Sequence, residues 1–205
     1  MPTVQEITGL VLAGGRGSRM GGLDKGLQAL SGQLLVTRCL DRLAPQVGAI
    51  AINANRHVDH YAKWSHPVWP DAPPYCFEGP LAGFLTGLRH CSTPYLCTVP
   101  CDSPFFPADL VLKLARGLEQ AGADLAVVET SEGRPRVHPT FCLMKAALHE
   151  ALLTFLQSGQ RKVDAWINTR NAVRVPFELP DKQSQAFMNI NTLQQLEQVE
   201  RSHRA

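Results

Sequence analysis

The chain has 205 residues, of which 44% are hydrophobic and 19% are charged. This composition can bury an apolar core, and it excludes an intrinsically disordered chain. Twenty Lys and Arg against 18 Asp and Glu leave a formal net charge of only +2, so we expect no nucleic-acid partner. The sequence has no apolar run long enough for a membrane span and no signal-peptide pattern, so we expect a cytoplasmic protein without a membrane partner.

Apolar, β-branched runs alternate with helical patterns along the chain. We expect strands at residues 7–12, 49–53, 95–99, 124–128, 137–143 and 172–177, and helices at 34–43, 81–90, 107–120, 145–156 and 192–201. This alternation predicts an α/β fold with three layers, Rossmann-like, around a mostly parallel central sheet, with residues 1–205 as a single domain. Ligands of such sheets bind beyond the carboxyl ends of the strands, so we expect the site at the loops after residues 12, 53 and 99.

Six cysteines are present, and none forms a C-x-x-C pair or another common zinc spacing. We therefore expect reduced, mostly buried thiols in a reducing compartment.

A glycine-rich, basic loop follows the first predicted strand. Residues 12–26 read LAGGRGSRMGGLDKG and contain six glycines, two arginines and a lysine. Glycines let successive N–H groups approach an anion, so the loop favours a triphosphate, although a flexible surface loop is the alternative. It is not a P-loop, because Asp24 rather than glycine precedes Lys25. It also fails the dinucleotide fingerprint, because Met20 takes the place of the third glycine.

The order of residues in this loop carries a resemblance. The pattern L-x-G-G-x-x-x-R-M-G-x-x-D-K is filled by Leu12, Gly14, Gly15, Arg19, Met20, Gly21, Asp24 and Lys25. Further matching segments are NANR (53–56), GPLAG (79–83), PCDSPF (100–105), HP (138–139), RKVDAW (161–166) and NINT (189–192). Together they resemble the molybdenum cofactor guanylyltransferase family over nearly the whole chain, which implies a nucleotidyltransferase fold.

The resemblance implies that the enzyme transfers GMP from GTP to molybdenum-molybdopterin, forming the molybdopterin guanine dinucleotide cofactor and releasing pyrophosphate. It also implies transient contacts with other proteins of the cofactor pathway or with apo-enzymes, and we expect a monomer. One alternative is a cytidylyltransferase that uses CTP, which Ala13-Gly14-Gly15 disfavours because those enzymes resemble Ala-Ala-Gly there. Another is a non-catalytic carrier of the pterin or nucleotide.

Asp102 is the candidate ligand of Mg²⁺, for which Mn²⁺ could substitute. It follows the third predicted strand, where a carboxylate would face the ligand crevice, although a turn or helix-cap aspartate is the alternative. The resemblance favours the metal role. Lys25 and Arg19 would offset the charge on the leaving pyrophosphate, and Asn191 is a second candidate contact of the metal or, alternatively, a contact of the phosphates.

Asn53 and Asp71 are the candidates for recognising the base. Guanine offers two donors and an acceptor, which a carboxylate and an amide can satisfy, although Asp71 also suits a turn. The resemblance carries both residues to nucleotide binding, together with the backbone of Leu12, Ala13, Gly14 and Gly15.

Three further residues are assigned to the pterin by resemblance, namely Gly22, Arg161 and Lys162. Two cations beside Trp166 suit a flat phosphorylated heterocycle, but a solvated helix start is the alternative. His138 beside Pro139 suits a structural, half-buried position.

Overall fold

The apolar run at residues 7–12 becomes an inner strand of a seven-stranded sheet. The computed structural model of the chain describes residues 1–17, 21–132, 134–178 and 185–204. The strands are β1 (Ile7–Leu12), β2 (Ala29–Leu30), β3 (Gln33–Leu34), β4 (Ala49–Asn53), β5 (Val68–Trp69), β6 (Tyr95–Pro100), β7 (Leu125–Glu132), β8 (Arg134–Lys145) and β9 (Ala172–Phe177). The α-helices are α1 (Leu35–Leu43), α2 (Val58–Tyr61), α3 (Pro80–His90), α4 (Leu110–Gln120), α5 (His149–Gln157), α6 (Val163–Ile167) and α7 (Leu193–Arg204).

The main sheet has the order β5-β4-β1-β6-β8-β7-β9, and β8 is antiparallel to both of its neighbours while the other pairs are parallel. The predicted α/β fold with a mostly parallel sheet is therefore confirmed. Leu12 is in register with Asn53 of β4 and with Pro100 of β6. The loops that follow these three strands consequently start side by side at one edge of the sheet.

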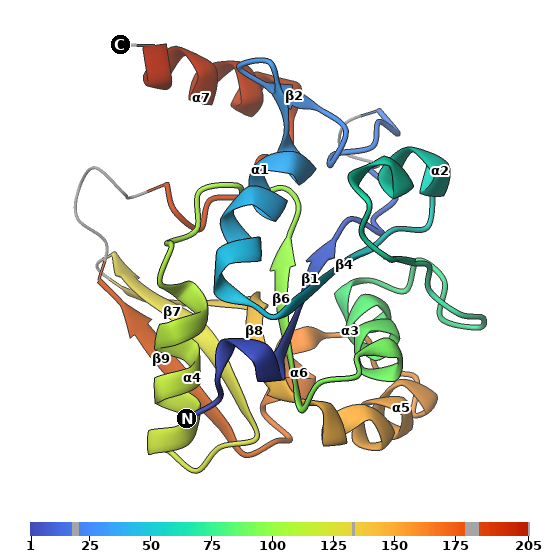
Figure 1. Cartoon of the computed structure of the whole chain (residues 1–205), viewed down its shortest axis with the longest axis vertical. Coiled ribbons are helices and arrows are strands. Elements are labelled where there is room, and N and C mark those ends of the chain that lie inside the picture. Colours follow the sequence, from blue (N-terminus) through green and yellow to red (C-terminus); the bar gives the residue numbers. More distant parts are fainter. Residues whose placement is uncertain (18–20, 133, 179–184, 205) are drawn as a thin grey trace.

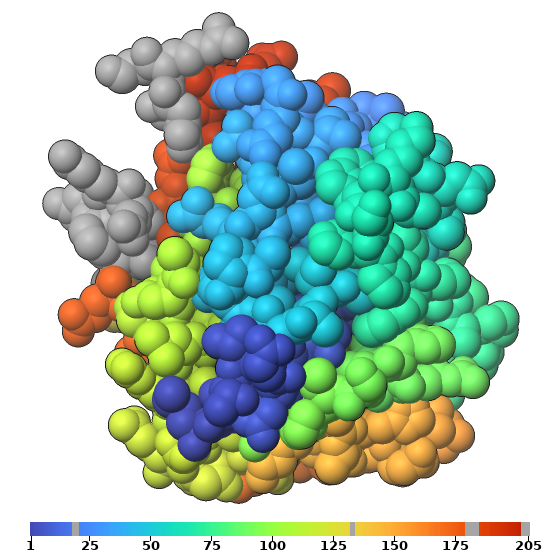
Figure 2. All heavy atoms as spheres, in the orientation of Figure 1, coloured from blue at the N-terminus to red at the C-terminus, as the bar shows by residue number. Residues whose placement is uncertain are grey.

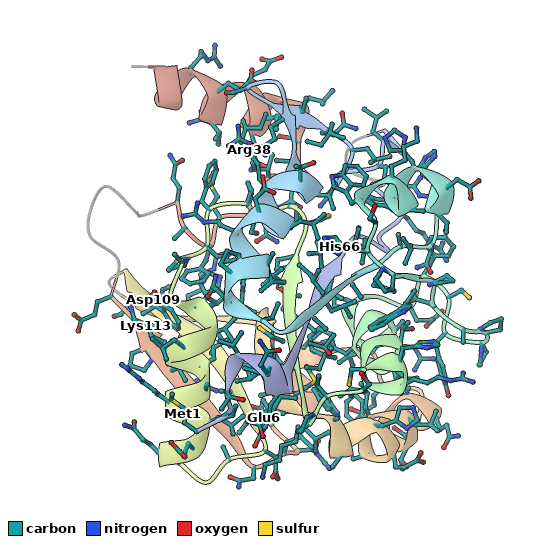
Figure 3. All side chains as sticks on the ribbon, in the orientation of Figure 1. Met1, Glu6, Arg38, His66, Asp109 and Lys113 are labelled. Carbon is teal, nitrogen blue, oxygen red and sulfur yellow. The ribbon has the colours of Figure 1, made fainter. Side chains whose placement is uncertain are left out.

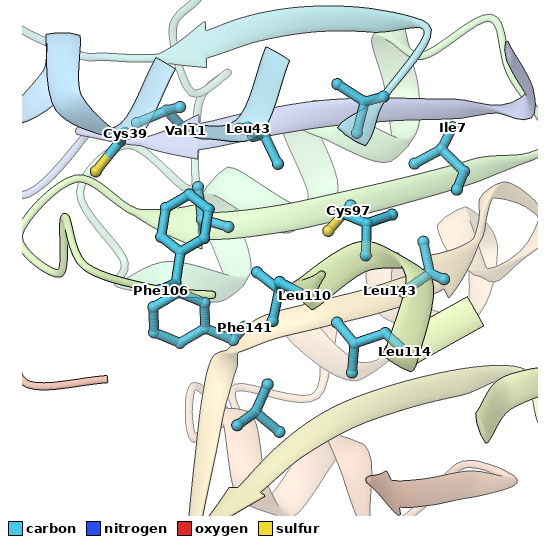
Figure 4. Packing of buried hydrophobic residues seen from close by; sticks show 14 of the residues in the cluster. Ile7, Val11, Cys39, Leu43, Cys97, Phe106, Leu110, Leu114, Phe141 and Leu143 are labelled. Atoms are coloured by element: carbon cyan, nitrogen blue, oxygen red, sulfur yellow. The ribbon is translucent and has the colours of Figure 1, made fainter. Parts of the chain in front are cut away.

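Helices cover both faces of the sheet and produce three layers (Figure 1). Helices α1 and α4 pack on one face, where Val11 and Cys97 point toward them (Figure 4). Helices α3, α5 and α6 pack on the other face, against Leu10 and Leu96. Adjacent residues of one strand thus bury their side chains on opposite faces, which is why these strands have continuous apolar sequences.

The N-terminal residues lie on the surface near α4 (Figure 2). The amino group of Met1 pairs with Glu119 at the end of α4. One turn into the same helix, Lys113 Nζ lies 3.0 Å from Asp109 Oδ2, and both side chains are labelled in Figure 3. Because β1 starts at Ile7, residues 1–6 lie at the amino ends of the parallel strands.

Several predicted boundaries differ from the structure. The helix expected at 107–120 begins at Leu110, and the one expected at 145–156 begins at His149, after a 3₁₀ turn at Ala146–Leu148. The strand expected at 137–143 extends over Arg134–Lys145, because pairing with β7 continues it into a polar segment. The structure also contains the β2–β3 hairpin, α2 and β5, which the sequence pattern does not predict. Helix α6 begins directly after Lys162, where a helix start is the alternative given above.

None of the helices in the described part of the chain is long and apolar enough to cross a bilayer.

Candidate active site

A cavity of about 390 Å³ opens at the carboxyl ends of β1, β4 and β6. It is lined by eight of the residues predicted from the sequence: Leu12, Ala13, Gly14, Gly15, Lys25, Asn53, Asp71 and Asp102. These residues come from separate segments, and the shared register of the three strands brings them together. The volume is in the range typical of small-molecule sites.

The glycine-rich loop forms one wall of the cavity. In the described part of the chain, the N–H groups of Gly14, Gly15, Arg16 and Gly17 donate to no acceptor. Gly17 has a φ of +65°, and a Cβ there would lie 2.0 Å from the carbonyl oxygen of Leu23, so only glycine fits. Successive free N–H groups of this kind can bind an anion.

Asp102 lines the same cavity, in the turn after β6. Lys25 Nζ donates to Asp102 Oδ2 at 2.9 Å and to Asn191 Oδ1 at 2.6 Å. Asp102 Oδ1 is buried, and it accepts no hydrogen bond from any residue that the structure describes. An unpaired buried carboxylate oxygen is costly, so this atom is available to a cationic ligand.

The segment around Asn191 is attached directly to the Asp102 turn. The Ile190 N–H donates to the Asp102 carbonyl at 2.7 Å, and Ser103 Oγ donates to Asn189 Oδ1 at 2.9 Å. Asn189 also lines the cavity. The C-terminal part of the chain therefore completes the Asp102 side of the cavity.

Asp71 organises the other end of the cavity. Asp71 Oδ1 accepts hydrogen bonds from Asn53 Nδ2 at 2.8 Å and from Thr86 Oγ1 at 3.3 Å. Its Oδ2 accepts from Asn55 Nδ2 at 2.6 Å and from the Phe77 N–H at 3.4 Å. Asn53 Nδ2 also donates to the Trp69 carbonyl, so both of its amide hydrogens are engaged while Asn53 Oδ1 accepts no bond from the described residues.

Asp24 fixes the turn that carries Lys25. Asp24 Oδ1 accepts from the Tyr61 hydroxyl at 2.6 Å and from the Gly26 N–H at 3.2 Å. Burial, together with the negative charge of Asp24, raises the pKa of Tyr61, so its hydroxyl stays protonated and donates. Burial and Asp102 likewise raise the pKa of the Cys101 thiol, which lines the cavity and stays protonated at neutral pH.

The residues predicted for the pterin do not line this cavity. Arg161 Nε donates to Glu78 Oε2 at 2.5 Å, and its guanidinium lies 5.8 Å from the centroid of the Tyr75 ring. Lys162 is exposed at the start of α6, and Gly22 is exposed in the glycine-rich loop. Arg19 lies outside the described residues.

The sequence assigns no role to several residues of the cavity, among them Arg16, Phe77 and Thr140, and it includes Asn189 only as part of the NINT segment. Arg16 lies over the Phe77 ring at 5.4 Å. Asn53 is a predicted base contact, whereas Asn55 enters the prediction only through the NANR segment of the resemblance. Alternation along an extended chain could have placed the two side chains near each other. No local signal places Thr140 at the cavity, because it arrives through the antiparallel strand β8.

Fold and cavity together define an α/β nucleotidyltransferase, in which a glycine-rich loop and a carboxylate line one cavity at the carboxyl ends of the strands. The sequence profile of the family described as "MobA-like NTP transferase domain" matches residues 9–174. The chain therefore belongs to the MobA-like NTP transferase family, and the resemblance inferred from its motifs is confirmed.

Relatives cover almost the whole chain. The "Molybdenum cofactor guanylyltransferase" of Bordetella petrii is 53% identical over 195 residues, which is 95% of this chain and 97% of the relative. The protein of the same description from Ralstonia nicotianae is 52% identical, covering 97% of this chain and 98% of its own length. The solved structure of molybdopterin-guanine dinucleotide biosynthesis protein A from Archaeoglobus fulgidus has a TM-score of 0.78 at 23% identity, covering 96% and 98% of the two chains, and supports the fold.

Proposed function

We propose that this enzyme transfers GMP from GTP to molybdenum-molybdopterin, forming the molybdopterin guanine dinucleotide cofactor and releasing pyrophosphate. One observation carries the proposal: a single cavity joins a wall of free N–H groups to a carboxylate with an unpaired oxygen, Asp102 Oδ1. The choice of substrates in this proposal follows the relatives that are described as molybdenum cofactor guanylyltransferases.

The cavity supports one orientation of the nucleotide. Its phosphates would lie along the N–H groups of Gly14 and Gly15, near Lys25, because that wall offers donors and a positive charge. The base would lie toward Asn53, next to the backbone of Leu12 and Ala13. Asp71 already accepts four hydrogen bonds there, so it would act on the base mainly by holding Asn53.

The residues at the other wall fit a divalent cation. Asp102 Oδ1 is a buried, unpaired oxygen, and carboxylate oxygens are preferred ligands of Mg²⁺. The amide oxygen of Asn191, which accepts a hydrogen bond from the same Lys25 as Asp102, would be a second oxygen ligand. When bound, Mg²⁺ or Mn²⁺ would neutralise charge on the phosphates.

The reaction needs little beyond positioning and charge. An oxygen of the terminal pterin phosphate attacks the α-phosphorus of GTP, the bond to the β-phosphate oxygen breaks, and pyrophosphate leaves with that oxygen. The attacking oxygen is already anionic near neutral pH, so no side chain has to remove a proton. Lys25, together with Arg19, would stabilise the charge that builds on the leaving group.

The pterin would approach from the open side of the glycine-rich loop. We propose that Gly22 and Lys162 border its phosphate, since both are exposed. Arg161 would support the same region through Glu78, because its Nε is engaged there. We further propose that the enzyme acts as a monomer in the cytoplasm and passes its product to other pathway proteins or apo-enzymes.

A nucleotide panel tests the proposed function. The full chain is incubated with molybdenum-loaded molybdopterin, Mg²⁺ and each of GTP, CTP, ATP and UTP, while pyrophosphate release and product mass are measured. We expect release with GTP and a product heavier by one GMP moiety. A preference for CTP would make the enzyme a cytidylyltransferase, and GTP binding without pyrophosphate release would indicate a carrier.

Paired variants connect the activity to the cavity. Asp102→Asn should abolish nearly all turnover without unfolding the protein. Asp109→Asn changes an aspartate whose carboxylate instead pairs with Lys113 on α4, and it should leave turnover unchanged. Full activity of Asp102→Asn would refute the assignment of Asp102.

A further inference from the structure

Residues just after β4 are attached to the carbonyl oxygens of the glycine-rich loop. Arg56 Nη1 donates to the Gly22 carbonyl at 2.8 Å, and Arg56 Nη2 donates to the Gly15 carbonyl at 3.3 Å. Asn55 Nδ2 donates to the Gly14 carbonyl at 3.0 Å. One short segment therefore engages three carbonyls of the loop.

The engaged carbonyls and the free N–H groups belong to the same peptides of the loop. Carbonyl oxygens carry partial negative charge and would repel a phosphate, whereas N–H groups attract it. Because Asn55 and Arg56 bind the carbonyls of Gly14 and Gly15, the next N–H groups, those of Gly15 and Arg16, are directed away from these donors. They have no acceptor in the described part of the chain.

Arg56 also joins the two arms of the loop. Gly15 lies on the outgoing arm and Gly22 on the returning arm, where the Gly22 N–H donates to the Gly17 carbonyl at 3.1 Å. A guanidinium can hold two carbonyls because its donors form a rigid fork, whereas a lysine ammonium is a single point. No Asp or Glu among the described residues forms an ion pair with Arg56, so its charge stays close to the loop without a paired carboxylate.

From these contacts we infer that Arg56 is a positioning residue for the triphosphate: its guanidinium fixes the two arms of the loop so that the N–H groups face the phosphates. This inference rests on the proposed function, because it assumes that the loop binds a nucleoside triphosphate. If Arg56 has this role, the affinity lost when Arg56 is replaced should increase with the number of phosphates on the ligand. A residue that only stabilised the fold would weaken all ligands alike.

The test compares a series of ligands on the full chain. Dissociation constants of guanosine, GMP, GDP and GTP are measured by calorimetry with Mg²⁺ for the wild type, Arg56→Ala and Arg56→Lys. Arg170→Ala is the matched control. Arg170 Nε donates a hydrogen bond to Thr169 Oγ1 just before β9, and β9 is the outermost strand on the side of the sheet away from β4 and β5. Unfolding temperatures of all four proteins are recorded alongside.

We expect Arg56→Ala to bind GTP at least about tenfold more weakly, while its affinity for guanosine stays within about twofold. Arg56→Lys keeps the charge but not the fork, so its GTP affinity should fall between those of Arg56→Ala and the wild type. In turnover, the loss should appear in the KM for GTP more than in kcat. The Arg170→Ala control should match the wild type throughout.

Two results would overturn the inference: equal losses for guanosine and GTP, or a lysine variant with full GTP affinity, which would leave only the charge to matter. Should Arg56→Ala fail to fold, the lysine variant alone decides between these outcomes. If the wild type gains no affinity from guanosine to GTP, the proposed function itself fails, whatever the variants show.

Discussion

Asp71→Asn should loosen the polar end of the cavity and weaken nucleotide binding. The carboxylate accepts four hydrogen bonds, with donors on Asn53 (2.8 Å), Asn55 (2.6 Å), Thr86 (3.3 Å) and Phe77 (3.4 Å). An amide has only one acceptor oxygen, so two of these donors would meet an NH₂ group instead. A hydrogen bond to a charged group contributes about 1.5–3 kcal/mol, so the expected loss is about 3 kcal/mol or more.

Thermal unfolding and GTP titration measure the two effects. For a chain of this length, 3 kcal/mol corresponds to a decrease in Tm of about 6–12 °C. GTP affinity should decrease at least about tenfold, because Asn53 would lose the carboxylate that holds its amide. Asp59→Asn is the control, since Asp59 is exposed on α2 and should change stability by less than about 0.5 kcal/mol. Equal Tm values for the two variants would refute this reasoning, and an unchanged GTP affinity would remove Asp71 from the nucleotide site.

Three further predictions concern stability and the shape of the site. Tyr61→Phe should lower the free energy of unfolding by about 1–3 kcal/mol in urea, because Asp24 loses a donor at 2.6 Å; an unchanged midpoint would contradict this. Burial lowers the pKa of His138 to about 4. Between about pH 6.5 and pH 4 the unfolded chain therefore binds one proton more than the folded chain at this residue, and the free energy of unfolding should fall as the pH drops, by up to about 1.4 kcal/mol per pH unit. His138→Gln should lack this contribution, and an equal slope for the variant would contradict the prediction. Gly83→Ala should raise the Kd for GTP several-fold, because its Cβ would lie 2.6 Å from Asn53 Oδ1, and an unaltered Kd would place that oxygen outside the site.

The buried strands could be predicted because their residue types favour a strand over a helix or a loop. The runs at Ile7–Leu12, Ala49–Asn53 and Ala172–Phe177 are short and rich in apolar or β-branched residues, and each forms a strand within the predicted limits. The β2–β3 hairpin could have been predicted from the Ser31-Gly32 pair, which is a turn signal in the sequence. Both residues adopt the positive φ values that a tight hairpin turn requires. Short elements such as α2 have no periodicity long enough to detect.

The parts of the site that could not be predicted from the sequence depend on contacts between residues far apart in the chain. The general rule for parallel sheets was sufficient to gather Asn53, Asp102 and the glycine-rich loop, since all follow strands that end at one edge. Asn189 reaches the cavity only because Ser103 and the Asp102 carbonyl bind its segment, and such pairing leaves no trace in spacing. The ion pair of Arg161 with Glu78 is likewise a long-range contact that the sequence alone did not predict.

We propose that one cavity holds a triphosphate between the glycine-rich loop and a cation at Asp102. The most direct test measures the affinity for Mn²⁺ by electron paramagnetic resonance, with and without GTP. In the wild type, GTP should tighten Mn²⁺ binding, and Asp102→Asn should lose that increase while still binding guanosine. If the variant bound Mn²⁺ with GTP as tightly as the wild type, the cation would lie elsewhere and the account of the site would be wrong.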